Sequence, residues 1–259
     1  MEIRVLGCYG SQLPGFNTTS FLLDGKILLD GGTITSVLTA EEQLKIEVVL
    51  VTHAHLDHIR DIMFLVDNLC FLKKKQPLLV LSTSPVIKAL RHHLFNNVIW
   101  PDFSRIPSAE APVLIFKVLG LGRPLSLSGV SVTAFKVNHA VETVGYVIES
   151  PEGTVIFSGD TGPTDEIWRI ARKKRGRLKA IFMETSLPED MQQIALKTGH
   201  LTPRSLEEEL EKLGDPDVPV YLYHLKSQWR EIIKKEVAEL RNGNIHILED
   251  GQILQIGAL

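Results

Sequence analysis

One short stretch concentrates the residues best suited to chemistry, Thr52-His53-Ala54-His55-Leu56-Asp57-His58. It holds three imidazoles and a carboxylate, the nitrogen and oxygen groups that bind divalent metal ions in proteins. Two such ions about 3.5–4 Å apart can stabilise both the attacking and the leaving oxygen of a displacement reaction. The simpler interpretation is a polar loop that is rich in histidine by chance. Three histidines and one aspartate so close together favour a metal site.

The residues around this stretch predict the elements that position it. The branched apolar run Val48-Val49-Leu50-Val51 comes directly before it and is typical of a buried strand. The segment 59–75 has helix-like spacing and ends in a lysine-rich turn, which suits the negative end of a helix dipole. The strand therefore delivers three imidazoles and a carboxylate into a loop at its carboxyl end.

Three later residues occupy the same kind of position. His139, Asp160 and His224 each follow an alternating or continuous apolar run that predicts a strand. A strand end offers a rigid backbone with an exposed tip, which is what a metal ligand needs. Any one of these residues alone is more often structural. Four such strand ends in one chain, the first of them rich in histidine, favour a shared metal site.

The rest of the chain predicts the fold class. Both halves begin with strands and continue with helices and strands together. Strands are expected at 3–6, 19–23, 26–29, 77–81, 178–183 and 218–223, as several short strands within 113–158, and as two short strands at the end. Helices are expected at 35–45, 59–75, 85–97, 164–174, 202–213 and 227–240. Two sheets packed face to face with helices outside satisfy this α/β (α+β) pattern, in a single domain over 1–259.

The composition is that of a soluble globular protein. The 259 residues are 44% hydrophobic and 23% charged, with a formal net charge of −3. This charge does not attract the chain to nucleic acid or to an anionic membrane. No apolar run approaches ~18 residues, the first residues lack a secretory signal pattern, and two cysteines are too few for a disulfide framework. A cytoplasmic location without membrane contact is expected.

Together with Asp30, which ends a predicted hairpin, these motifs resemble the metallo-β-lactamase fold superfamily. The resemblance implies a four-layer αβ/βα sandwich with a two-metal centre at one edge. The divalent ions expected there are zinc, with manganese or iron as alternatives that the same ligands accept. The resemblance implies one metal on His53, His55 and His139, a second on Asp57, His58 and His224, Asp160 bridging them, and Asp30 behind the ligand loop.

The substrate is indicated by Glu184-Thr185-Ser186 and by Gly199-His200-Leu201-Thr202-Pro203. These motifs resemble the class II cyclic-nucleotide phosphodiesterases, and Glu184 and His200 are also similar to the tRNA 3′-end processing endonucleases. The resemblance implies that Glu184 orients His200 and that His200 protonates the leaving 3′-oxygen. An imidazolium held by a carboxylate is a suitable proton donor near neutral pH. Without the resemblance, His200 is more readily explained as a residue at the start of a helix.

The expected activity is hydrolysis of a 3′,5′-cyclic nucleotide, cyclic AMP or cyclic GMP, to the 5′-monophosphate. A hydroxide held by the metals attacks phosphorus, and Asp57 helps to orient it. The resemblance also implies substrate contacts from Thr161, Asn17 and Thr18. The partner is a small-molecule cyclic nucleotide, and a homodimer is compatible with the sequence.

Three alternatives remain. An endoribonuclease acting on tRNA precursors typically carries a long Gly/Pro-rich arm, whereas this chain has only a short loop at 188–198 in that interval. The cationic run 172–177 would suit RNA, but such runs more often form a solvated helix end. A scaffold without activity usually loses ligands, and this chain retains all seven. Hydrolysis of a lactam, thioester or lactone needs the metals but no Glu184–His200 proton donor.

Two features are left open by the resemblance. Asp61 stands where the phosphodiesterases usually carry glycine or serine, and we interpret it as a solvent-facing or helix-capping carboxylate. The proline-marked segment 100–112 is either a substrate-facing loop or a plain surface connection.

Overall fold

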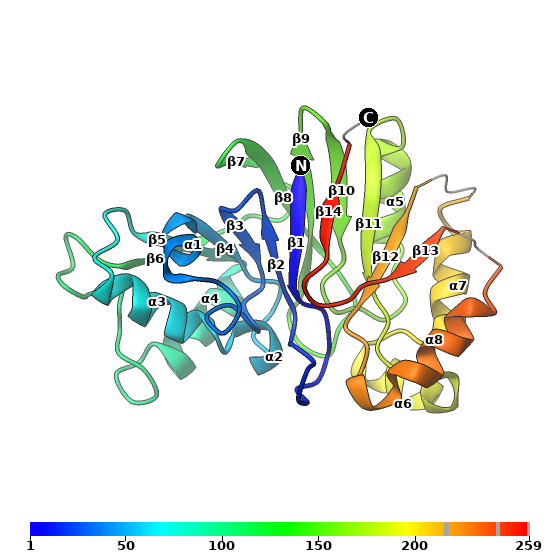
Figure 1. Ribbon diagram of the computed structural model, residues 1–259. Coiled ribbons are helices and arrows are strands. Elements are labelled where there is room, and N and C mark those ends of the chain that lie inside the picture. The colour runs from blue at the N-terminus through cyan, green and yellow to red at the C-terminus, as the bar shows by residue number, and fades with distance from the viewer. Residues whose placement is uncertain (215–217, 242–243, 258–259) are drawn as a thin grey trace.

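The structure is a computed structural model that describes residues 1–214, 218–241 and 244–257. Two sheets pack face to face at its centre, and helices cover their outer faces (Figure 1). In the described part of the chain each sheet has seven strands, in the orders β14-β1-β2-β3-β4-β5-β6 and β13-β12-β11-β10-β9-β8-β7. This arrangement is the predicted αβ/βα sandwich.

The elements have the following bounds. The first sheet contains β1 (Glu2–Gly7), β2 (Ser20–Leu23), β3 (Ile27–Leu29), β4 (Val48–Leu50), β5 (Leu78–Ser82), β6 (Leu114–Val118) and β14 (Ile253–Gln255). The second contains β7 (Leu125–Leu127), β8 (Val130–Lys136), β9 (Val144–Ser150), β10 (Gly153–Phe157), β11 (Leu178–Glu184), β12 (Val220–Tyr223) and β13 (Ile245–Ile247). The helices are α1 (Ala40–Lys45), α2 (Leu56–Ile59), α3 (Ile62–Phe71), α4 (Ser84–Ala89), α5 (Glu166–Lys174), α6 (Gln192–Thr198), α7 (Pro203–Glu211) and α8 (Arg230–Ala238).

Alternating side chains hold the layers together. On β2, Phe21 and Leu23 enter the core shared with the second sheet, while Leu22 enters the core beneath α3. The ring of Phe21 lies 5.0 Å from that of Phe157 and 5.4 Å from that of Tyr223, measured between ring centres, both edge to face. An aromatic cluster therefore joins the first sheet to the second.

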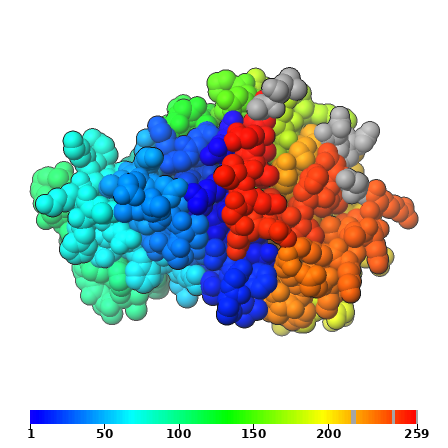
Figure 2. Space-filling model, in the orientation of Figure 1, coloured from blue at the N-terminus to red at the C-terminus, as the bar shows by residue number. Residues whose placement is uncertain are grey.

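The strand directions bring several carboxyl ends to one edge. In the second sheet β10, β11 and β12 are parallel, and β8 runs the same way because both β8 and β10 are antiparallel to β9. In the first sheet β3, β4 and β5 are parallel. β14 pairs with β1, so the first and last strands lie side by side, blue beside red in Figure 2. Loops that leave the parallel strands are thereby gathered at one edge.

Three helix predictions were wrong in their bounds. The helix expected over 85–97 is α4 followed by a π-helical turn at Leu90–Leu94. The helix expected over 35–45 begins only at Ala40, because Thr39 caps it and forms a capping box with Glu42. The helix expected over 59–75 is instead α2 and α3, with a break at Arg60 and Asp61. The loop that follows β3 is therefore longer than expected, and the segment after β4 contains the short helix α2 before this break.

Asp61 occupies the N-cap position of α3, but its side chain does not cap that helix and does not face solvent, contrary to the interpretation from the sequence. Its carboxylate is nearly buried and accepts hydrogen bonds from the backbone N–H of Ile34, from that of Thr35 at 2.6 Å, and from Thr35 Oγ1 at 2.9 Å. The side chain thus holds the turn after β3 against the start of α3.

The segment 188–198 is not the short loop that the sequence suggested. It forms a 3₁₀ turn at Glu189–Met191 and then α6. Ile194 and Leu196 are exposed while Ala195 is buried, so the apolar residues give no single stripe that would predict a helix. The next helix, α7, begins as predicted, with Thr202 as its cap and Pro203 in its first turn. Within the described residues no helix is both long enough and apolar enough to cross a bilayer.

Candidate metal centre

All seven predicted ligands meet at the edge where the strands end. Among the residues that the structure describes, three groups of side chains have ligand atoms within 4.8 Å of one another. The groups are His53, His55, His139 and Asp160; Asp57, His58 and His224; and Asp160, His200 and His224. The first two groups correspond to the two metal positions that the resemblance implied. The third adds the expected proton donor to the same cluster.

Asp160 lies at the centre of the cluster. Its Oδ1 is 3.3 Å from His58 Nε2, and its Oδ2 is 3.7 Å from His53 Nε2 and 3.2 Å from His224 Nε2. Burial alone would raise the pKa of this carboxyl, but the nearby charges of His224 and His58 hold it well below its ordinary value. The group is therefore ionised and faces imidazoles of both candidate metal positions.

The donor set fits a divalent cation. Thr52 Oγ1 donates to Asp30 Oδ2 at 2.8 Å, so the contact of 3.0 Å between Thr52 Oγ1 and His53 Nδ1 is a bond that the imidazole donates. His53 Nε2 then carries a lone pair, and this atom is buried without a hydrogen-bond partner. An unsatisfied buried acceptor is costly, whereas a bound cation would satisfy it.

The surroundings of His58 also fit a divalent cation. Its Nδ1 lies 2.8 Å from Asp30 Oδ2, which turns Nε2 toward His224 Nε2 at 3.1 Å. Burial would lower the pKa of His58, yet the carboxylates of Asp160 and Asp30 hold it well above the ordinary value. The negative potential that attracts a proton to this ring also attracts a metal cation.

Two residues at the centre have strained backbones. Asp30 and His224, which follow β3 and β12, have φ angles of +59° and +67°, in the left-handed region that glycine prefers. His224 N donates to Cys8 O at 2.6 Å, which fixes this turn. A Cβ atom at Gly10 would lie only 2.7 Å from the His224 ring, so only glycine permits this close approach.

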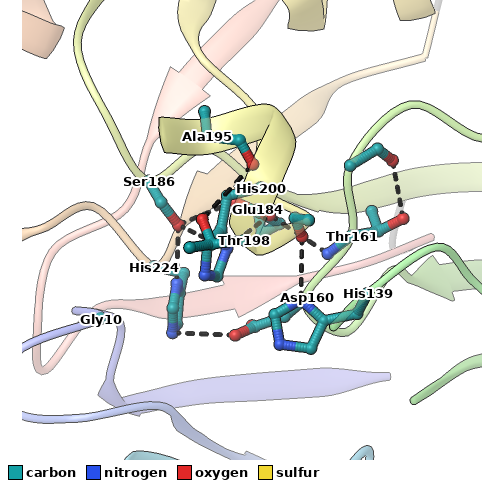
Figure 3. A network of polar contacts seen from close by, with 12 residues as sticks. Gly10, His139, Asp160, Thr161, Glu184, Ser186, Ala195, Thr198, His200 and His224 are labelled. Carbon is teal, nitrogen blue, oxygen red and sulfur yellow. Dashed lines mark hydrogen bonds and ion pairs between the residues drawn. The ribbon is translucent and has the colours of Figure 1, made fainter. Parts of the chain in front are cut away.

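The predicted proton-donor pair is assembled beside the ligands (Figure 3). Glu184, at the end of β11, is fully buried, and its Oε1 is 3.0 Å from His200 Nδ1. The His200 ring is stacked on that of His224, with ring centres 5.4 Å apart. Gly199, with φ +71°, ends α6, and its carbonyl accepts from His139 Nδ1 at 2.8 Å. The loop that carries His200 is thus attached directly to a candidate ligand, His139.

The pKa of His200 follows from these contacts. Burial would lower it, but the charge of Glu184 and the hydrogen bond to it raise the pKa above its ordinary value. Burial also raises the pKa of Glu184, an effect that the charge of His200 opposes. The protonated form of His200 is therefore stabilised next to the cluster.

The three predicted substrate residues have structural contacts. Thr161 N donates to Glu184 Oε1 at 3.1 Å, so this buried residue supports the proton-donor pair. Asn17 Nδ2 donates to Leu6 O, and Thr18 Oγ1 contacts Thr33 Oγ1 at 3.3 Å. These bonds hold the chain after β1 to the first sheet, and a substrate role for the three residues stays a prediction.

Sequence reasoning gave no separate role to Ser186. It was noted only as part of a motif, because a serine two residues after a glutamate carries no signal of its own. In the structure its hydroxyl contacts Glu184, His200 and His224.

A family model described as a beta-lactamase superfamily domain matches residues 32–224. This match covers most of the chain, and the chain belongs to the metallo-β-lactamase superfamily. The superfamily is hydrolytic, so the predicted family and the prediction of a hydrolase are confirmed.

The chain is also similar to curated proteins with stated activities. It is 27% identical to a probable 3′,5′-cyclic-nucleotide phosphodiesterase of Yersinia pestis, over 91% of this chain and 74% of the relative. It is 28% identical to a 3′,5′-cyclic-nucleotide phosphodiesterase of Schizosaccharomyces pombe, over 71% of this chain and 58% of the relative. A ribonuclease Z of Pyrococcus horikoshii is 27% identical over 59% of this chain and 49% of its own length. The chain thus spans little more than half of the second relative and about half of the third.

Solved structures share the fold. Unliganded yeast PDE1 has a TM-score of 0.84 at 20% identity, covering 99% of both chains. The metallo-beta-lactamase fold protein YhfI from Bacillus subtilis has a TM-score of 0.79 at 20% identity, over 98% of this chain and 99% of that one. The short form of human tRNase Z has a TM-score of 0.71 at 17% identity, over 99% of both. These similarities establish the sandwich fold.

Proposed function

We propose that this chain is a metal-dependent phosphodiesterase that hydrolyses 3′,5′-cyclic nucleotides to 5′-monophosphates. The stated activities of the Yersinia and Schizosaccharomyces relatives support this substrate class. The proposed centre holds two divalent cations, zinc first and manganese or iron as alternatives, and the whole chain acts as one domain. His53, His55 and His139 would hold the first cation, Asp57, His58 and His224 would hold the second, and Asp160 would contribute to both.

The pairing of Glu184 with His200 is the observation that carries the proposal. Divalent cations in such a centre activate water and neutralise charge on a phosphoryl group. A departing sugar oxygen also needs a proton, which water activation alone does not supply. His200, with Nδ1 bonded to Glu184 Oε1 at 3.0 Å, has Nε2 free to donate that proton. Asp57, 3.2 Å from His224 Nε2, is the carboxylate proposed to orient the attacking water.

A tRNA 3′-processing-like endoribonuclease is the second candidate, because ribonuclease Z relatives also match. The cationic run 172–177 gives this candidate little support. Arg172 donates to Lys212 O, Lys174 pairs with Glu149 at 2.7 Å, and Arg177 Nη2 donates to Ser150 O at 2.6 Å. These cations attach the end of α5 to neighbouring segments.

The test is a substrate panel on one purified sample with metal analysis. The panel contains 3′,5′- and 2′,3′-cyclic nucleotides, bis(p-nitrophenyl) phosphate, a tRNA precursor and nitrocefin. We expect bound divalent metal and preferential hydrolysis of the 3′,5′-cyclic nucleotides. Preferential cleavage of the tRNA precursor would select the endoribonuclease, and a chain without bound metal would contradict both.

A further inference from the structure

One buried hydroxyl lies between the proton-donor pair and the metal ligands (Figure 3). Ser186 Oγ is 2.9 Å from Glu184 Oε2, 2.8 Å from His224 Nδ1 and 3.2 Å from His200 Nδ1. The side chain is fully buried, so bulk solvent does not compete for these contacts. Ser186 therefore touches the carboxylate, the proton donor and a candidate ligand together.

The hydrogens on these groups fix the direction of each bond. A serine hydroxyl has one hydrogen and a carboxylate oxygen only accepts, so Ser186 donates to Glu184 Oε2. The contact with His224 is then a bond that Nδ1–H donates to Ser186 Oγ. A neutral imidazole has a single N–H, so His224 Nε2 keeps its lone pair. That atom lies 3.2 Å from Asp57 Oδ2 and from Asp160 Oδ2.

We propose that Ser186 is a positioning residue whose hydroxyl fixes the Nδ1–H tautomer of His224 and links that ring to Glu184. The inference rests on the proposed function, because it takes His224 as a metal ligand and His200 as the proton donor. Glu184 then orients His200 directly and His224 through Ser186. A ligating histidine whose other nitrogen is hydrogen-bonded in this way presents the correct nitrogen to the metal.

The backbone of Ser186 keeps its hydroxyl in place. Ser186 N donates to Leu201 O at 2.9 Å, and Lys226 N donates to Ser186 O at 3.0 Å. These bonds attach the residue to the segment that carries His200 and to the one that carries His224. Removal of the hydroxyl alone is therefore expected to leave the backbone in position and to change only the ring contacts.

The first test reads the His224 ring directly. The native chain, Ser186→Ala and Ser186→Thr are labelled with ¹⁵N-histidine and compared by NMR near neutral pH, metal-free and zinc-loaded. We expect a slowly exchanging Nδ1–H signal from His224 in the native chain and in Ser186→Thr, and its loss in Ser186→Ala. Thr185→Val is the matched control, because it removes a neighbouring buried hydroxyl that donates only to Glu184 O. A retained signal in Ser186→Ala, or its loss in the control as well, would overturn the inference.

The second test separates this inference from the proposed function. Ser186→Ala is expected to bind zinc ~10–100-fold more weakly in chelator competition. With zinc in excess, its kcat is expected to fall by a larger factor than its KM changes. Unchanged affinity and kcat would overturn the inference while the function stands. If the native chain binds zinc but hydrolyses no cyclic nucleotide, the proposed function fails, and the metal-free NMR comparison still decides the role of Ser186.

Discussion

The first sheet supplies most of the candidate ligands from one continuous segment, whereas the second supplies one residue from each of several elements. His53 to His58 follow β4 without interruption. His139, Asp160, Glu184 and His224 come from the ends of β8, β10, β11 and β12. The segment is recognisable in the sequence by itself, but the dispersed residues become a site only when the strands are parallel and adjacent. The first half of the centre is therefore evident from local sequence alone, whereas the second half was predicted from strand ends and the family resemblance and is brought together by tertiary structure.

The two halves are nevertheless supported in the same way. Each has one fully buried carboxylate behind its imidazoles, Asp30 in the first half and Glu184 in the second. Asp30 contacts His58 directly and reaches His53 through the hydroxyl of Thr52. Glu184 contacts His200 directly and reaches His224 through the hydroxyl of Ser186. The halves differ in what the direct partner is proposed to do, which is metal binding in the first and proton donation in the second.

Replacement of Asp160 tests whether the halves form one centre, and it should have the largest effect. Asp160→Ala removes the carboxylate that faces His53, His58 and His224. We expect loss of bound metal by elemental analysis and loss of measurable hydrolysis. Asp165→Ala, which removes a carboxylate whose side chain is 92% exposed, should retain both. Full metal content in Asp160→Ala would mean that the halves bind metal independently.

Replacement of His200 should separate proton donation from metal binding. His200→Ala is expected to keep its metal and to lose about 10²–10⁴-fold in kcat, the usual effect of removing a general acid. Metal content and kcat are measured on the same sample. Equal activity in the variant would remove the role that we assign to His200.

Replacement of Asp30 tests the support of the first half. Asp30 Oδ1 accepts from Thr52 N, and Oδ2 accepts from Thr52 Oγ1 and His58 Nδ1. An asparagine has only one acceptor oxygen, so its amide nitrogen would face a donor on one of the two sides. Asp30→Asn should weaken metal binding ~10–100-fold and lower the free energy of unfolding by about 1–3 kcal/mol. Chelator competition and denaturant unfolding measure these effects. Unchanged zinc affinity in Asp30→Asn would show that the two halves are not supported in the same way.

Replacement of Glu184 tests the support of the second half, and the pH dependence of kcat is the measurement. Glu184 raises the pKa of His200 above its ordinary value, so the protonated donor persists to higher pH and is lost as the pH rises through that pKa. Glu184→Gln removes the raising charge, and burial then lowers the pKa. We expect the alkaline limb of the kcat profile to move to lower pH. An unmoved limb would show that another group titrates there.

The smallest effect is expected at the end of α5. Lys173 is exposed and lies within the cationic run that would suit RNA. Lys173→Glu should change cyclic-nucleotide hydrolysis by less than about twofold, because exposed substitutions away from special features have small effects. A large loss of affinity for a tRNA precursor in a binding assay would instead favour the endoribonuclease.

Local signals in the sequence predicted the strands and the start of α7, since apolar runs and the Thr202-Pro203 pair act through near neighbours. The bond partners of Asp61 could not be predicted, because its carboxylate is satisfied by Ile34 and Thr35 from another turn. α6 was missed because its apolar side chains form no single stripe. The role of Ser186 could not be predicted, because its partner His224 lies 38 residues further along the chain and meets it only in the folded sheet.

The left-handed φ angle of His224 sets stability and activity against each other at one position. Glycine adopts such an angle without strain, and it also removes the ring that crowds Gly10. A mutant library sorted only for resistance to heat is therefore expected to collect His224→Gly. Those survivors would lack one candidate metal ligand, so heat resistance alone is a misleading criterion for improving this enzyme.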